Sequence, residues 1–111
     1  MNKNKNQIQQ GDVLLFIKSL PPGCKRIKLD KRGAILAEGE HTGHYHGCAD
    51  EGVAMMEDKN GARYVVNETD EPRSFVHQEH KPVTIPAHSV AQIGIVREKD
   101  WFQDMVRNVV D

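Results

Sequence analysis

The sequence lacks the features of a secreted, membrane-spanning or nucleic-acid-binding protein. No stretch approaches the ~20 consecutive apolar residues of a membrane helix, and the opening residues, MNKNKNQIQQ, contain no apolar signal-peptide core. The net charge is −1 with histidine neutral, so no strong field attracts nucleic acid or an anionic membrane. We therefore expect a cytoplasmic protein with neither kind of partner.

Cysteine and serine are also scarce, which excludes several kinds of site. The two cysteines, Cys24 and Cys48, form no Cys-x-x-Cys pair, so a zinc ribbon is excluded, and in the cytoplasm both thiols are expected to be free. The serines, Ser19, Ser74 and Ser89, all lie in turn-like segments. The chain has no nucleophile elbow, glycine-rich phosphate loop or His-Glu-x-x-His helix. These absences argue against a serine hydrolase and a zinc protease.

What the sequence does contain is a series of short apolar runs separated by glycine and proline turns. Such runs predict β-strands, and the segment DKNG between two of them predicts a hairpin. A chain of 111 residues fits one domain. We expect a flexible segment over residues 1–9, then a single all-β domain, a small barrel or sandwich, over 10–111. The runs that predict strands are VLLFI, KRIKL, AILAEGEHTGHYH, VAMME, RYVVN, SFVHQEHKPVTI and VAQIGIV.

In the last segment, residues 100–111, the apolar residues follow a different spacing. Its apolar residues recur at helical spacing, and Asp100 and Gln103 stand where an N-cap and its capping-box partner belong. A short C-terminal amphipathic helix is predicted, which packs on its own sheet or forms part of a homodimer interface. The apolar residues are Trp101, Phe102, Met105, Val106, Val109 and Val110.

Histidine is concentrated in the segment GEHTGHYHGC. His44 and His46 are two residues apart, so in a strand they share one face with Cα atoms ~7 Å apart, a separation that two ligands of one ion can close. His41 falls off that face. Cys48 continues the parity, but a small buried apolar side chain is the favoured reading.

A second cluster lies in the segment HQEH, which contains His77 and His80. In a strand these two residues face opposite ways, and the shared parity with Phe75 and Val83 directs His77 inward. A turn before Pro82 would instead bring His80 round, and the sequence leaves this choice open. We expect His44 and His46 to converge with His77 or His80 on a divalent metal ion. The alternative is that these histidines make only local hydrogen bonds.

The histidine segment resembles the first motif of the cupin family, which has a glycine, a His-x-His pair, a glutamate and a later glycine. The matching residues are Gly39, His44, His46, Glu51 and Gly61. The second motif is degenerate, because His88 stands in place of its glycine and Ala91 in place of its last histidine. The resemblance implies a double-stranded β-helix barrel whose metal is held by His44 and His46, with Glu51 as a further candidate ligand. The missing ligand would then come from His77 or His80.

The segment also resembles small uncharacterised bacterial and phage proteins that carry Gly-Glu-x-Thr-Gly-His-x-His. That resemblance carries no activity with it.

Two functions follow as hypotheses. One is a metal-dependent enzyme acting on a small molecule, with Zn, Fe, Mn or Ni as the metal, since imidazole suits all of these. In it Glu40, Glu51 or Glu79 would be a further ligand, a group that orients a ligand, or a general base. The alternative is a non-catalytic module that binds a small ligand or a protein, such as an accessory protein of a mobile element, with structural histidines.

Overall fold

The computed structural model describes residues 6–38 and 43–95, and over these residues the fold is all-β, as the sequence predicts. No helix in this part of the chain is long and apolar enough to cross a membrane. The predicted C-terminal helix over 101–110, as well as Glu40 and His41, lies outside the described residues. The strands are β1 (Gln7–Gln10), β2 (Val13–Ile17), β3 (Lys25–Ile27), β4 (Ala34–Glu38), β5 (Tyr45–Cys48), β6 (Val53–Glu57), β7 (Arg63–Asn67), β8 (Arg73–Phe75), β9 (Val83–Ile85) and β10 (Val90–Ile95).

Six of these strands form one antiparallel sheet in the order β1-β2-β10-β7-β6-β3. The run VAQIGIV becomes β10, which pairs with β2 on one side and β7 on the other. The polar run KRIKL becomes the edge strand β3, as its composition indicates. The segment DKNG joins β6 to β7 as the predicted hairpin, in which the Asp58 carboxylate accepts the backbone N–H groups of Asn60 and Ala62.

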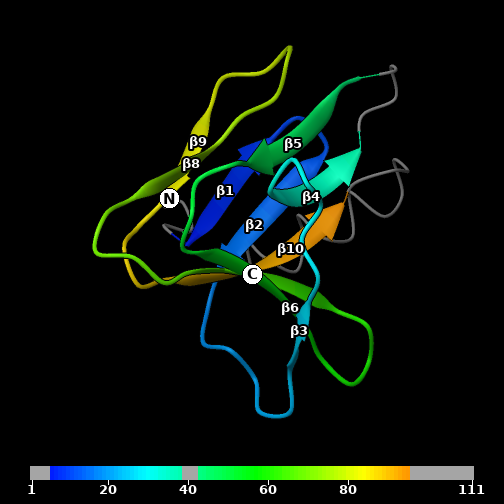
Figure 1. Cartoon of the computed structure of the whole chain (residues 1–111), viewed down its shortest axis with the longest axis vertical. Helices are drawn as coiled ribbons and strands as arrows, with labels where there is room; N and C mark the ends of the chain where they lie inside the picture. Colours follow the sequence, from blue (N-terminus) through cyan, green and yellow to red (C-terminus); the bar gives the residue numbers. More distant parts are fainter. Residues whose placement is uncertain (1–5, 39–42, 96–111) are drawn as a thin grey trace, which may run out of the picture.

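The four remaining strands form a second layer. β4 pairs with β5 and β8 pairs with β9, and one bridge between Gly47 and Val76 joins the two pairs. At this bridge each residue donates its N–H to the carbonyl of the other, at 3.0 and 2.9 Å. Figure 1 shows β4 and β5 drawn over β2 and β10, and β8 and β9 close to β1.

The core lies between these layers. Residues that are direct neighbours across five strands of the large sheet form an apolar row, because side chains directly opposite one another share a face. This row consists of Ile17, Ala91, Val65, Met55 and Ile27. The smaller layer contributes Ala34, Leu36, Cys48, Phe75 and Ile85 to the same cluster.

The two layers approach each other along both margins, with β9 against β1 and β4 against β6. No ladder of hydrogen bonds joins the described strands at these margins, so β1 and β3 remain the open edges of the large sheet. The described part of the chain is therefore a two-layer sandwich and not a closed barrel.

The N-terminal boundary also differs from the expectation. Residues 7–9, assigned to a flexible segment, form most of β1, which pairs with β2 from Gln7 opposite Phe16 to Gln10 opposite Val13. Glutamine side chains hide this strand from sequence patterns, but its backbone completes the ladder and Ile8 packs against the core.

The extended stretch from Ser74 to Ile85 is a hairpin, broken by a loop over 76–82. Pro82 ends that loop, since β9 begins at Val83. Phe75 pairs with Val83 and is fully buried, as its parity predicted. The loop carries both histidines of the segment HQEH.

Both cysteines are free, as predicted. Cys48 is 2% exposed and belongs to the core, and burial is the main cause that raises the pKa of its thiol. It is therefore a small buried side chain and not an exposed thiolate.

Gly33 lies just before β4, where the backbone packs closely against the end of β5. It has a φ of 109°, and a Cβ there would overlap the Cys48 carbonyl and lie 2.8 Å from Ala49 Cα. Gly61 has a similar φ of 89° but nothing within 4 Å of its would-be Cβ. We expect Gly33→Ala to lower the free energy of unfolding by about 2–4 kcal/mol and Gly61→Ala by only ~1 kcal/mol, because both substitutions strain the backbone but only the first forces atoms apart. Urea denaturation measures both, and equal losses would show that the contact at Gly33 is unimportant.

Candidate functional site

Four histidines from distant parts of the sequence lie together at one end of the sandwich. The bridge between Gly47 and Val76 places His46 opposite His77, in the kind of antiparallel pair whose side chains lie closest. The ring centroids of His46 and His77 are 4.3 Å apart, and those of His77 and His80 are 4.6 Å apart. The His46 and His80 rings are 6.0 Å apart. The sequence left open which residue of the second cluster meets the first, and in the structure both do.

His44 completes the group from the residue just before β5. Its ring meets that of His77 edge-on, at 5.6 Å between centroids. Its Nδ1 atom lies 3.8 Å from a carboxylate oxygen of Glu79. One of the three glutamates named from sequence is therefore next to the histidines.

His46 is the buried member, with 4% of its surface exposed. Its Nδ1 lies 2.8 Å from Gln10 Oε1. The Gln10 amide nitrogen donates to the carbonyl oxygens of Phe75 and Lys81, both at 2.9 Å. A flipped amide would set its oxygen against two carbonyl oxygens, so Oε1 must face His46. Because an amide oxygen can only accept a hydrogen bond, the proton in this contact belongs to His46 Nδ1. Neutral His46 therefore carries its proton on Nδ1 and a lone pair on Nε2.

His77 has the opposite tautomer. Its Nδ1 accepts the backbone N–H of Glu79 at 3.0 Å, so the proton of the neutral ring is on Nε2. The neighbouring rings of His46 and His77 thus offer one acceptor and one donor.

Both rings are held in the neutral form. Burial lowers the pKa of His46 to about 4, with further lowering from His77 and His80, against the opposing charge of Asp12. Burial also lowers the pKa of His77, with smaller contributions from His80 and His44. At pH 7 both are therefore neutral imidazoles, the form that binds a metal ion.

The turn between β1 and β2 closes one side of the cluster. Gly11 has a φ of 55°, and a Cβ on it would lie 2.5 Å from His80 Nε2. A glycine therefore both allows the turn and lets the His80 ring lie against the backbone. Sequence reasoning missed Gln10, Gly11 and Asp12, because the polar strand before them was not recognised. The turn signal Gly-Asp before VLLFI was the available clue.

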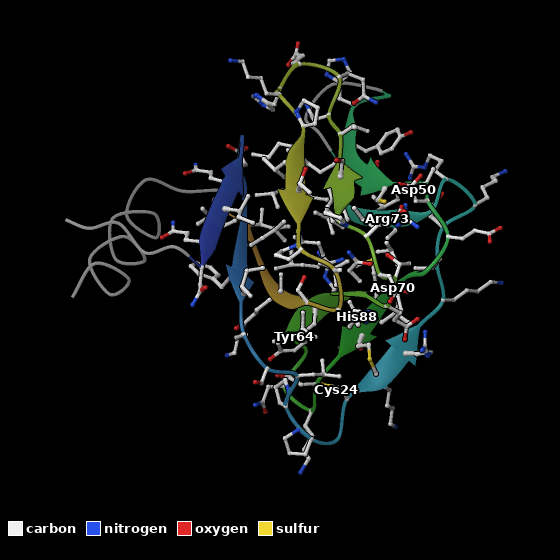
Figure 2. The ribbon with its side chains drawn as sticks, turned by 90° about the vertical axis from the view of Figure 1, so that its left-hand side faces the viewer. Cys24, Asp50, Tyr64, Asp70, Arg73 and His88 are labelled. Atoms are coloured by element: carbon white, nitrogen blue, oxygen red, sulfur yellow. The ribbon has the colours of Figure 1, made fainter. Side chains whose placement is uncertain are left out.

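Two other residues named from sequence lie elsewhere. Glu51 is exposed in the turn over 50–52, beyond the far end of β5. His88 is exposed, as expected, and its Nε2 lies 2.5 Å from Asp70 Oδ1. Figure 2 shows this pair, which lies at the opposite end of the β8–β9 hairpin from the 76–82 loop.

The imidazole rings stack on one another, and their nitrogen atoms do not point to one common position. His46, His77 and His80 are tilted against one another by 14–32°. Over residues 6–38 and 43–95, no three or more His, Cys, Asp or Glu side chains are arranged as a metal ion would require. The cluster has the neutral imidazoles and nearby carboxylates of a metal site, but a ring must turn for three of them to share one ion.

The chain belongs to a protein family described as a domain of unknown function, DUF8820, whose model matches residues 9–88. The match covers well over half of the chain and includes Gln10 and all four clustered histidines. No curated protein and no solved structure matches the chain significantly.

The burial of neutral His46 makes stability depend on pH. Its folded pKa of about 4 lies below the unfolded value of 6.5, so between these values the unfolded chain binds more protons. The contribution of neutral His46 to the free energy of unfolding is fully present above pH 6.5 and is lost as the pH falls toward 4. We expect the free energy of unfolding to drop as the pH is lowered from 6.5 to 4, by about 2–3 kcal/mol more in the native chain than in His46→Gln. Urea denaturation with a chelator present measures this drop.

The matched control is His88→Gln, which removes an exposed histidine and should leave the pH profile of the native chain unchanged. A profile for His46→Gln that is as steep as the native one would contradict the assignment to His46.

Proposed function

We propose that the protein binds a divalent transition metal ion through the histidine cluster, with His46 as its first ligand. The observation that carries this proposal is the hydrogen bond from His46 Nδ1 to Gln10, which leaves the Nε2 lone pair for a ligand. Ligating histidines commonly donate their other ring nitrogen in this way. Zn, Fe, Mn and Ni all accept imidazole, and the choice among them follows from geometry and availability.

The remaining ligands come from the other rings. His44 and His80 both lie next to His77, and all four rings are linked by centroid separations of 4.3–6.0 Å. Glu79 beside His44 supplies a carboxylate as a further ligand or as a base. Glu51 has no such placement, so the carboxylate that the cupin resemblance would assign to it is not part of this proposal.

A cupin-like ancestry is part of the same proposal. His88 stands where the second cupin motif has glycine, and it has a φ of 54°, a conformation that glycine adopts readily. Ala91, in place of the motif's last histidine, is fully buried on β10. These features support descent from a cupin-like double layer in which the 76–82 loop replaces the lost ligand. A homodimer through the C-terminal helix stays a prediction from sequence.

What the metal does follows from its surroundings. An ion held by His46 and its neighbouring imidazoles, with the Glu79 carboxylate nearby, would supply Lewis-acid chemistry to a small molecule. The residue that would act on the substrate directly is Glu79, as a proton acceptor at its exposed carboxylate.

The second candidate is a non-catalytic ligand- or protein-binding module in which the histidines are structural. It is favoured by the hydrogen bond that His46 Nδ1 already donates to Gln10 Oε1 and by the one that His77 Nδ1 already accepts from the Glu79 N–H. These bonds satisfy one nitrogen of each ring without an ion, which is what a buried polar group needs in order not to destabilise the fold.

Metal titration separates the two candidates. We expect the tag-free protein at pH 7.5 to bind one equivalent of Zn²⁺ or Co²⁺ in isothermal titration calorimetry. His46→Ala should weaken this binding at least about 100-fold, because the substitution removes a metal ligand itself and not a residue that orients a ligand. His88→Ala, the matched control, should bind as the native chain does.

Absence of binding by the native chain, or equal binding by His46→Ala, would reject the metal proposal and leave the ligand- or protein-binding module. Elemental analysis of freshly purified protein provides an independent check.

Metal binding should also change the tautomer of His77. Its Nε2 carries the proton while Nδ1 accepts the Glu79 N–H, so coordination through Nε2 requires that this hydrogen bond break. We expect Zn²⁺ to shift the ¹H–¹⁵N resonance of the Glu79 amide and to move the His77 ring proton to Nδ1. An unchanged Glu79 amide in the metal-bound protein would exclude His77 Nε2 as a ligand without affecting the assignment of His46.

A further inference from the structure

The side chain of Gln10 connects three segments of the candidate site. It is 3% exposed at the end of β1 and makes hydrogen bonds to His46 on β5, to Phe75 at the end of β8 and to Lys81 near the end of the 76–82 loop. Its two N–H groups and its carbonyl oxygen are all used in these three contacts, which are 2.8–2.9 Å long. No other glutamine in the described residues has side-chain contacts to three separate segments.

We propose that Gln10 is a positioning residue that holds His46 in the Nδ1-protonated tautomer and anchors the histidine loop against it. The effect of Gln10 on metal binding at His46 Nε2 rests on the proposed function. Its structural half, the fixed tautomer, stands on the hydrogen bonds alone.

The geometry allows only one arrangement of this amide. The carbonyl oxygens of Phe75 and Lys81 flank the loop that carries His77 and His80, and both accept from the Gln10 nitrogen. The amide therefore cannot flip, and its oxygen stays on His46. Because the site is buried, water cannot readily replace any of these bonds.

A neutral amide also suits this position better than a carboxylate. An ionised side chain here would face two carbonyl oxygens and would lie in a buried place without a positive partner. It would also stabilise the charged imidazolium and so oppose the neutral form of His46 that a metal requires. Glutamine accepts from His46 and donates to the loop without adding charge.

A merely structural role for Gln10 would predict a loss of stability alone, so the test reads the tautomer directly. The variants are Gln10→Met, which keeps length but removes all three bonds, and Gln10→Glu, which keeps the acceptor. Gln9→Met on the same strand is the matched control, because Gln9 is exposed and, among the residues that the structure describes, its side chain bonds to the Gly11 carbonyl alone.

The first measurement is long-range ¹H–¹⁵N correlation of the histidine rings in metal-free protein at pH 7.5, which distinguishes a protonated ring nitrogen from a bare one. We expect His46 to be protonated on Nδ1 in the native chain, in Gln9→Met and in Gln10→Glu. In Gln10→Met we expect a mixture of both tautomers. An Nε2-protonated His46 in the native protein would overturn the proposal without any variant.

The second measurement is Zn²⁺ affinity by calorimetry, with circular dichroism to show that each variant is folded. We expect Gln10→Met to bind about 10–100-fold more weakly than the native chain, because the tautomer of His46 is no longer fixed. Gln10→Glu should also bind more weakly than the native chain, because its carboxylate favours the charged imidazolium of His46. A folded Gln10→Met with native tautomer or native affinity would overturn the proposal. Should Gln10→Met not fold, Gln10→Asn, which is too short to reach His46, takes its place with the same expected outcome.

The two proposals fail in different ways. A native chain that binds no Zn²⁺ but shows the Nδ1 tautomer, lost in Gln10→Met, would reject metal binding and retain Gln10 as the positioning residue.

Discussion

The arrangement of the whole site depends on one backbone contact, the bridge between Gly47 and Val76. Two hydrogen bonds there set the register between β5 and the end of β8, and this register places His46 opposite His77. A shift of one residue would turn the histidines to the other face of their strands. Gly47 also permits the approach on its other side, because a Cβ there would lie 2.8 Å from Ile35 Cδ1. The two histidine segments lie in separate strand pairs, and this contact holds them in register.

The more buried rings of the cluster, His46 and His77, are compatible with a stable fold because they are neutral and hydrogen-bonded. Four imidazolium groups at these distances would repel one another, and a buried charge without a partner is costly. The structure avoids this cost with neutral acceptors and donors, Gln10 for His46 and the Glu79 N–H for His77. The opposite tautomers of these two rings follow from those bonds. A site built in this way stays ready for a ligand at neutral pH but becomes unstable in acid.

The site is also divided between rigid and less constrained parts. His46 is on a strand and held from both sides, whereas His77 and His80 lie in a loop that Gln10 secures only at its ends. This division suits a centre whose first ligand is fixed and whose other ligands adjust. It also explains how the imidazoles can be gathered without their nitrogens already converging.

Much of the fold follows from local sequence patterns, because alternating and doubly apolar runs between turns specify strands directly. The i, i+2 spacing of His44 and His46 and the inward parity of Phe75 were also readable from sequence. The strand β1 was not, since its glutamines hide a segment that joins the sheet through backbone hydrogen bonds and contributes only Ile8 to the apolar cluster. The sequence could not choose between His77 and His80, because the answer depends on where the loop before Pro82 turns. Which distant segments meet, which tautomer His46 adopts and which carboxylate lies beside His44 were decided by tertiary packing, since these depend on contacts between residues more than 30 positions apart.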